Sequence, residues 1–92
     1  MNSFLNTVSE EARLEMERLN QEIKDIQKEI EACDQEANEL LKREARGEGV
    51  YASRVFELKQ GKMRLITEMQ HKKVRLNHLL LNPSPVEAKS DG

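Results

Sequence analysis

The sequence predicts an all-α protein, a long antiparallel two-helix coiled-coil hairpin, and three observations support this prediction. Apolar residues recur at alternating steps of four and three over a long stretch of the first half. A second stretch with the same period follows two closely spaced glycines, Gly47 and Gly49. Proline, the strongest helix breaker, occurs only at positions 83 and 85. A sustained period of 3.5 residues is typical of helices that pack along a narrow seam.

The composition favours long helices over a broad globular core. Charged residues make up 35% of the 92 residues, compared with roughly 25% in an average globular chain. Aromatic residues make up 3%, and tryptophan is absent, so few bulky side chains are available to fill a wide core. A chain of this length forms one small domain at most.

Charge is divided between the two halves of the chain. Positions 10–46 hold twelve acidic and seven basic residues, a net charge of −5, and positions 51–82 hold two acidic and seven basic residues, a net charge of +5. Opposite charges on two segments of one chain favour packing of these segments against each other. The charge pattern therefore supports a hairpin.

The two helices have recognisable ends. Thr7 and Glu10 have the spacing of a capping box, which satisfies free N–H groups of a first helical turn, while Ser3 and Ser9 are competing caps. Gly47 is suited to end the first helix because glycine readily adopts positive φ. The expected organisation is a lead-in at 1–6, helices over about 7–46 and 50–81 within a hairpin at 7–81, a turn at 47–49, and a disordered tail at 82–92.

The hairpin has a predicted apolar seam. If the chain reverses near Gly47, opposed residues have numbers that add up to about 95. Ile30 then faces Leu65, and Met16 faces Leu79. The predicted seam consists of Met16, Leu19, Ile23, Ile26, Ile30, Leu40, Val55, Leu58, Leu65, Met69, Leu76 and Leu79.

Two lysines, Lys62 and Lys72, interrupt this seam. A lysine stem can lie along an apolar surface while its ammonium group reaches outward. Beside the seam, the first helix has a glutamate at every seventh position, 15, 22, 29 and 36. We expect Lys62 to reach Glu29 or Glu36, and Lys72 to reach Glu22. Such pairs stabilise by only about 0–1 kcal/mol, so their expected role is to set the register of the helices.

The second helix has more apolar residues than one neighbouring helix can cover. A second stripe on this helix, and a segment of the first helix that extends beyond the end of the second, are both apolar. Monomers generally avoid exposing such surface, so we expect it to contact a second copy of the chain or another helical protein, completing a four-helix bundle by dimerisation or partner docking. The predicted partner-binding residues are Phe56, Met63, Ile66 and Leu80 on the stripe, and Phe4, Leu5 and Val8 on the extension.

No residue pattern predicts catalysis, a cofactor or a metal. His71 and His78 lie two helical turns apart, about 10 Å, which is too far to share one ion without intervening ligands. Cys33 falls on the seam, where a thiol behaves as a small hydrophobe. A single cysteine excludes an internal disulfide, and no apolar run approaches the ~18 residues of a membrane span. We therefore expect a cytoplasmic or otherwise intracellular protein that is not an enzyme and does not enter a membrane.

The expected function is protein–protein interaction through helical packing, as an adaptor, an assembly subunit or a scaffold. A first alternative is a small secretion- or assembly-type chaperone that holds a client helix, because the size, topology and second apolar stripe are similar to those of type III secretion chaperones. A second alternative is nucleic-acid binding by the basic face of the second helix. The acidic first helix and the scarcity of aromatic residues argue against nucleic acid.

Overall fold

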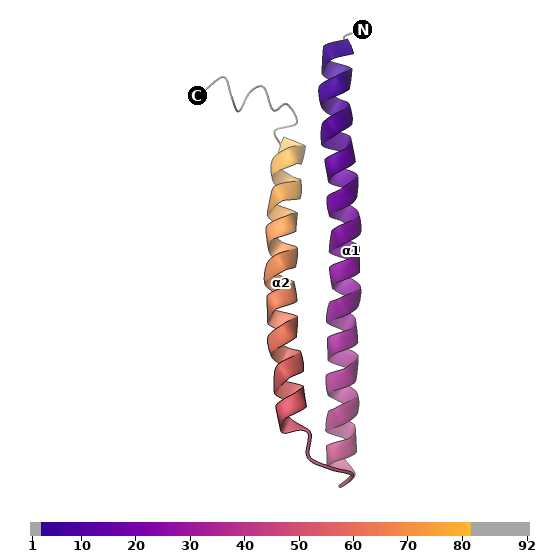
Figure 1. Cartoon of the computed structure of the whole chain (residues 1–92), viewed down its shortest axis with the longest axis vertical. Helices are drawn as coiled ribbons and strands as arrows, with labels where there is room; N and C mark the ends of the chain where they lie inside the picture. Colours follow the sequence, from indigo (N-terminus) through magenta and orange to yellow (C-terminus); the bar gives the residue numbers. More distant parts are fainter. Residues whose placement is uncertain (1–2, 82–92) are drawn as a thin grey trace.

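The structure is a computed structural model that describes the backbone of residues 3–81 and the side chains of residues 10–81. Helix α1 spans Ser3–Ala45 and helix α2 spans Ala52–Leu81. The two helices lie side by side and run in opposite directions (Figure 1). Residues 3–81 contain no strand. The prediction of an all-helical, two-helix hairpin is confirmed, and the expected tail at 82–92 lies outside the described residues.

Helix α1 begins earlier than the sequence predicted. Its first residue is Ser3, so Thr7 lies within the helix and the expected capping box at its start is wrong. Neither glycine nor proline occurs between these positions, so nothing in that segment prevents the helix from extending. The first turn contains no acidic residue, whereas Lys42 and Arg43 in the last turn complement the negative end of the helix dipole.

The turn after α1 is formed around a glycine in the left-handed conformation. Gly47 has a φ of +79°. Its N–H donates to the carbonyl of Glu44 at 3.0 Å, and the N–H of Glu48 donates to the carbonyl of Arg43 at 2.9 Å. These two hydrogen bonds form a Schellman motif, which satisfies the last carbonyls of the helix and ends it. The chain can then reverse and enter α2 at Ala52.

The helices pack along a single apolar seam. Ala37, Val55 and Leu58 form a buried cluster near the turn, and Leu40 and Tyr51 pack against it. The buried residues are Ala12, Leu19, Ile23, Ile26, Ala37, Val55, Leu58 and Leu79. The remaining predicted seam residues, Met16, Ile30, Leu40, Leu65, Met69 and Leu76, are half-buried.

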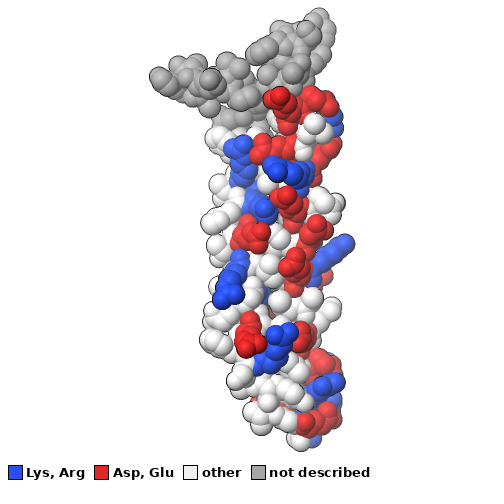
Figure 2. Space-filling model, in the orientation of Figure 1, with Lys and Arg blue, Asp and Glu red and all other residues white. Residues whose placement is uncertain are grey.

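The hairpin is thin, because each helix has only one neighbour. Its dimensions are 68 × 26 × 13 Å, and no side chain among residues 10–81 is fully buried. On the face drawn in Figure 2, acidic side chains gather over α1, and uncharged side chains make up much of the visible part of α2. A fold of this shape leaves both sides of the seam accessible, so the chemistry of each side determines what can bind there.

Candidate functional site

The two sides of the seam carry different side chains. In a 3.5-residue repeat, residues directly before seam positions lie on one side and residues directly after them lie on the other. We call the first the ion-paired side; it holds Glu15, Glu22 and Glu36 of α1 and Arg54 and Arg75 of α2. We call the second the groove side; it holds Asp34 and Leu41 of α1 and Lys59 and Ile66 of α2.

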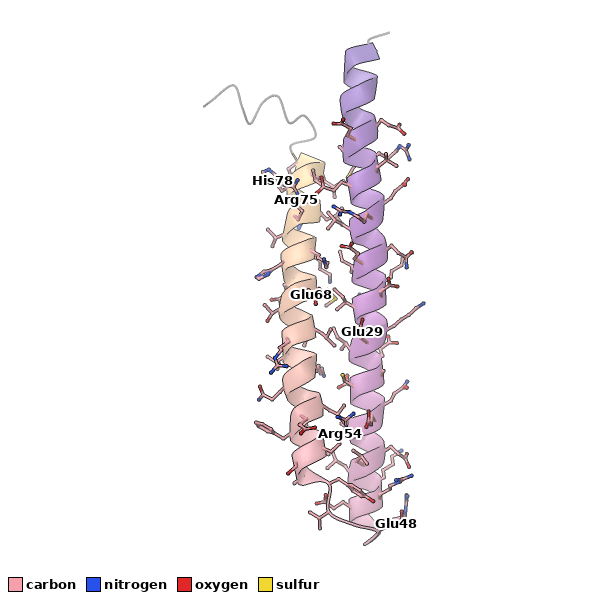
Figure 3. The ribbon with its side chains drawn as sticks, viewed as in Figure 1. Glu29, Glu48, Arg54, Glu68, Arg75 and His78 are labelled. Atoms are coloured by element: carbon pink, nitrogen blue, oxygen red, sulfur yellow. The ribbon has the colours of Figure 1, made fainter. Side chains whose placement is uncertain are left out.

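Two arginines bridge the helices on the ion-paired side. The guanidinium of Arg54 donates to both carboxylate oxygens of Glu36, at 3.0 and 3.3 Å. Arg75 donates to both oxygens of Glu15 in the same manner, at 3.0 and 3.2 Å. Arg54 and Arg75 lie near opposite ends of α2 (Figure 3). Paired bonds of this kind restrict orientation as well as distance, so they hold α2 to α1 at two separated points.

The Arg75 bridge also changes the acidity of its partner. The hydrogen bond from Arg75 is the main reason that the pKa of Glu15 lies below its ordinary value, and the charges of Arg75 and Arg18 act in the same direction. A lowered pKa means that the folded state favours the ionised carboxylate. At neutral pH, Glu15 is therefore ionised in the folded hairpin and keeps its bond to Arg75.

The two seam lysines differ in their partners. Lys72 donates to Oε1 of Glu22 at 3.0 Å, as predicted. Lys62 instead donates to Oδ1 of Asp34 at 2.8 Å, so the prediction that it reaches Glu29 or Glu36 is wrong. The carboxylate of Glu36 is bound by Arg54. Asp34 directly follows Cys33, the seam residue that faces Lys62, and therefore offers a near carboxylate on the groove side.

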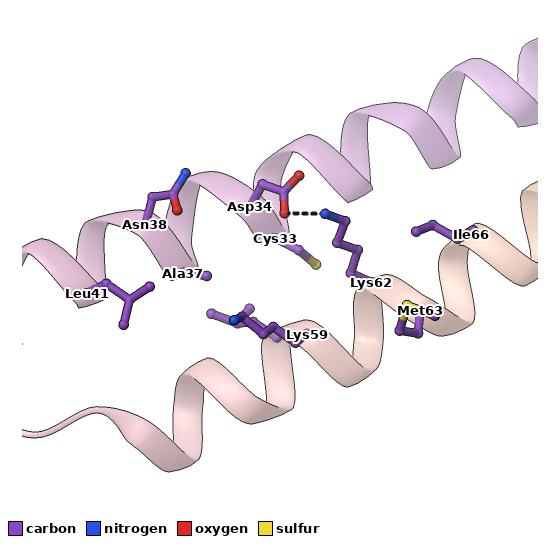
Figure 4. Close-up of a pocket in the computed structure, with 10 residues that line it drawn as sticks. Cys33, Asp34, Ala37, Asn38, Leu41, Lys59, Lys62, Met63 and Ile66 are labelled. Atoms are coloured by element: carbon purple, nitrogen blue, oxygen red, sulfur yellow. Dashed lines mark hydrogen bonds and ion pairs between the residues drawn. The ribbon is translucent and has the colours of Figure 1, made fainter.

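A groove of about 480 Å³ lies beside the seam on the groove side. Seam residues Cys33, Ala37 and Leu58 line it, together with Leu41 of α1 and Met63 of α2. In Figure 4 the ion pair between Lys62 and Asp34 connects the two helices at this groove. The groove therefore combines apolar walls with charged groups at its edge. That combination suits an apolar side chain or helix face of a partner.

Two of the four predicted partner-binding residues of α2 line this groove. Met63 and Ile66 line it, and Met63 is 58% exposed. Phe56, two turns from Met63 on the same face of α2, is 63% exposed. Leu80 is 59% exposed but lies at the other end of the helix. The structure therefore brings two of these four residues together in one groove, and neither Phe56 nor Leu80 is among the residues that line it.

The other three predicted partner-binding residues belong to α1. The backbone at Phe4, Leu5 and Val8 is helical, but their side chains lie outside the described part of the structure.

Sequence reasoning missed the wall of the groove that α1 contributes. Leu41 is 44% exposed and lines the groove, although it is not part of the 3.5-residue stripe. Its signal in the sequence is its place directly after seam residue Leu40, which puts it on the edge of the seam. Asp34 has the same relation to Cys33. A residue that directly follows a seam position can therefore be recognised as part of a groove wall once the position of the facing helix is known.

The cysteine and the two histidines lie in different environments. Cys33 is a free, half-buried thiol, and both His71 and His78 are exposed. Among residues 10–81, no three His, Cys, Asp or Glu side chains come close enough to hold a metal ion. Neither α1 nor α2, as far as the structure describes them, combines the length and hydrophobicity needed to cross a bilayer.

No protein-family model, curated protein or solved structure matches this chain. Inferences about its function therefore rest on its own residues and geometry.

Proposed function

We propose that this chain is a non-enzymatic protein–protein interaction module, an adaptor or assembly subunit, which binds a partner helix along its groove side. The observation that carries the proposal is the difference between the two sides of the seam. Arginine–glutamate bridges occupy the ion-paired side, whereas the groove side leaves Leu41 and Met63 exposed beside a groove of about 480 Å³.

The apolar residues have the spacing that helix binding needs. Phe56 and Met63 are seven residues apart, and Ile66 follows three residues later. Residues separated by three, four or seven positions lie along one face of a helix, and such a face packs against an amphipathic helix. Complete burial of one such side chain contributes about 1.5–3 kcal/mol. Several of them buried together contribute in the same direction and offset part of the cost of association.

The charges beside the groove indicate the chemistry of the partner. Lys59 and Lys62 line the groove, where Lys62 is paired with Asp34, and Lys73 lies about four turns beyond Lys59 on the same row of α2. Charge complementarity favours a partner helix with an apolar face and acidic flanking residues, since it determines orientation and discriminates against basic helices. A chaperone that holds a client helix would use the same groove with the same preference.

Nucleic-acid binding is less well supported by the charges of α2. Four of its seven basic side chains form ion pairs with carboxylates of α1, namely Arg54, Lys62, Lys72 and Arg75. A basic side chain that is already bound to a carboxylate contributes little to phosphate binding. The same carboxylates also repel a phosphate backbone that approaches the seam.

The proposal is tested with two synthetic amphipathic helical peptides that share one apolar face and differ in their flanks. One peptide has glutamate flanks and the other has lysine flanks, and binding to the full chain is measured by fluorescence anisotropy. We expect the glutamate-flanked peptide to bind at least about tenfold more tightly, because Lys59 beside the groove and Lys73 on the same row form no ion pair within residues 10–81. Equal binding of the two peptides would contradict the proposed partner chemistry.

Two variants locate the binding surface in the same assay. The double change Phe56→Asp, Ile66→Asp replaces two apolar residues of α2, of which Ile66 lines the groove, with charges, and we expect it to abolish binding of the glutamate-flanked peptide. Val74→Asp is the matched control, because Val74 is 67% exposed but is not among the residues that line the groove. Circular dichroism verifies that both variants keep their helices. Unchanged binding by the double variant would show that the peptide binds elsewhere.

A further inference from the structure

We propose that the partner is a second copy of the chain, and that two hairpins pack groove side on groove side with their turns at the same end. A two-fold axis parallel to the helices relates the copies. Helix α1 of each copy then lies antiparallel beside α2 of the other, which forms a closed four-helix bundle. This inference rests on the proposed function, because it names the partner of the same groove.

The first argument is the position of the groove along the hairpin. Its lining residues lie between Cys33 and Leu41 on α1 and between Leu58 and Ile66 on α2, in the half of the hairpin next to the turn. A two-fold axis parallel to the helices keeps every residue at its level, so the two grooves face each other. A perpendicular axis joins the grooves only if it passes through them, and the far halves of the hairpins then extend beyond each other. The parallel axis therefore joins the grooves and keeps the hairpins in contact along their length.

The second argument is the gathering of exposed apolar side chains at this level. Leu41, Phe56 and Met63 are 44%, 63% and 58% exposed, and half-buried Ile66 lines the groove with Met63. All four directly follow seam positions, so they lie on the groove side. In the dimer these residues of both copies meet, and the burial of their apolar surface favours association.

The third argument is the charge that the groove side carries on each helix. On α2 it holds two lysines, Lys59 and Lys73, and its other residues within 52–81 are uncharged. On α1 it holds Glu17 and Glu31. Glu17 is bound by a residue of its own helix, whereas Glu31, Lys59 and Lys73 form no ion pair with another side chain of residues 10–81. The groove side of α1 thus provides the acidic residues that the proposed function requires of a helix beside α2.

The fourth argument is that the symmetry brings these charges together. The two lysines are fourteen residues apart, and so are the two glutamates. Within one hairpin, both arginine bridges join residues whose numbers add up to 90. Because the parallel axis leaves every level unchanged, the same sum describes α1 of one copy beside α2 of the other. It pairs Glu31 with Lys59 and Glu17 with Lys73, while Lys24, between the two glutamates, lies opposite an uncharged residue. Each pair forms twice in the dimer.

The first test measures the distance between the two turns. A spin label is attached to each copy through Glu48→Cys in a Cys33→Ala background, and double electron–electron resonance gives the distance between the labels. Glu48 is exposed and does not line the groove. Light scattering should give a mass of twice 10.7 kDa. The label distance should be below about 35 Å, because both turns lie at one end of the bundle. A perpendicular axis at the middle of the hairpin would separate the turns by about 60 Å, and such a distance would overturn the inference.

Charge exchange tests the contact between Glu31 and Lys59. Lys59→Glu and Glu31→Lys should each raise the dissociation constant of the dimer by about tenfold or more, and the double variant should recover most of this loss. Arg64→Glu is the matched control, because Arg64 is exposed on α2 and does not line the groove. Losses that simply add in the double variant would overturn the contact.

The outcomes separate this inference from the proposed function. A chain that remains a monomer by light scattering, yet binds the glutamate-flanked peptide, overturns the second copy as partner and leaves the groove as a binding site. A dimer that survives the change Phe56→Asp, Ile66→Asp overturns the inference, because its interface does not use the groove side. The peptide assay then decides the proposed function by itself.

Discussion

Glu44 and Tyr51 are joined across the turn by a hydrogen bond of 3.0 Å, in which the backbone N–H of Tyr51 donates to Oε1 of Glu44. The carbonyl of Tyr51 in turn accepts the N–H of Val55 at 2.9 Å, so Tyr51 is the residue that caps the start of α2. In a capping box, a glutamate three residues into the helix accepts the same backbone N–H of the capping residue. Here the carboxylate comes from the end of the preceding helix, and it ties the two helices together at the turn.

Glu44→Ala should therefore destabilise the hairpin by about 1 kcal/mol, the typical cost of losing a helix cap. Glu44→Gln retains an oxygen acceptor and should lose less than half of that amount. Urea unfolding followed by circular dichroism, at one fixed protein concentration, measures both values. Equal losses in the two variants would show that the charge of Glu44 matters and its hydrogen bond to Tyr51 does not.

The same substitution should have opposite effects at two glycines. Gly47 has a φ of +79°, so Gly47→Ala places a side chain in the left-handed conformation and should cost about 1–2 kcal/mol. Gly61 lies inside α2, where an added Cβ meets no atom within 4 Å. Gly61→Ala should therefore stabilise the hairpin by up to about 1 kcal/mol.

Thermal unfolding of the two glycine variants, compared with the parent protein, measures both effects. A destabilising Gly61→Ala would indicate that a neighbour approaches this face of α2 in solution. A neutral Gly47→Ala would contradict the Schellman turn.

The fold could be predicted from the sequence because its determinants are local. The seam follows from a repeat of 3.5 residues, and the turn follows from a glycine placed directly after that repeat. The start of α1 could not be predicted as well, because Ser3, Thr7 and Ser9 are all suitable caps and nothing between them breaks a helix. A choice among competing caps depends on small energy differences, which a sequence pattern does not reveal.

The candidate site could be predicted only in part. The stripe that contains Phe56, Met63 and Ile66 is visible in α2 alone, and its role in partner binding stays a prediction. The contribution of α1 depends on the rotation of the two helices about their axes, which decides whether Lys62 turns toward Glu36 or toward Asp34. The structure shows the second arrangement. The groove side and the ion-paired side can therefore be distinguished only when this rotation of the helices is known.

The Glu15–Arg75 bridge predicts how stability depends on pH. The pKa of Glu15 in the folded state lies below its ordinary value because Arg75 donates a hydrogen bond to it, while in the unfolded state the pKa is about 4.3. The bridge therefore contributes its full stability above the unfolded-state pKa, and this contribution is lost as the pH falls through the lower, folded-state pKa.

Urea unfolding between about pH 7 and pH 3 measures this dependence. The parent protein should lose more stability below about pH 5 than Glu15→Gln, which cannot ionise, and Arg75→Met should resemble Glu15→Gln. Parallel curves for all three proteins would show that the bridge does not persist in solution. Because both side chains are partly exposed, added salt should reduce the difference among the curves.

Two leucines on α1 separate the contribution of the seam from that of the surface. Leu19 is 5% exposed and Leu14 is 52% exposed, so the same change to alanine removes the same atoms from two different environments. Leu19→Ala should cost about 2–3 kcal/mol, near the lower end for buried leucines, because a seam between only two helices can relax or admit water. Leu14→Ala should change stability by no more than about 0.5 kcal/mol, as expected for an exposed position. Denaturant unfolding of both variants at equal protein concentration measures the two losses of stability. Similar losses would mean that a partner, absent from the isolated hairpin, buries Leu14 in solution.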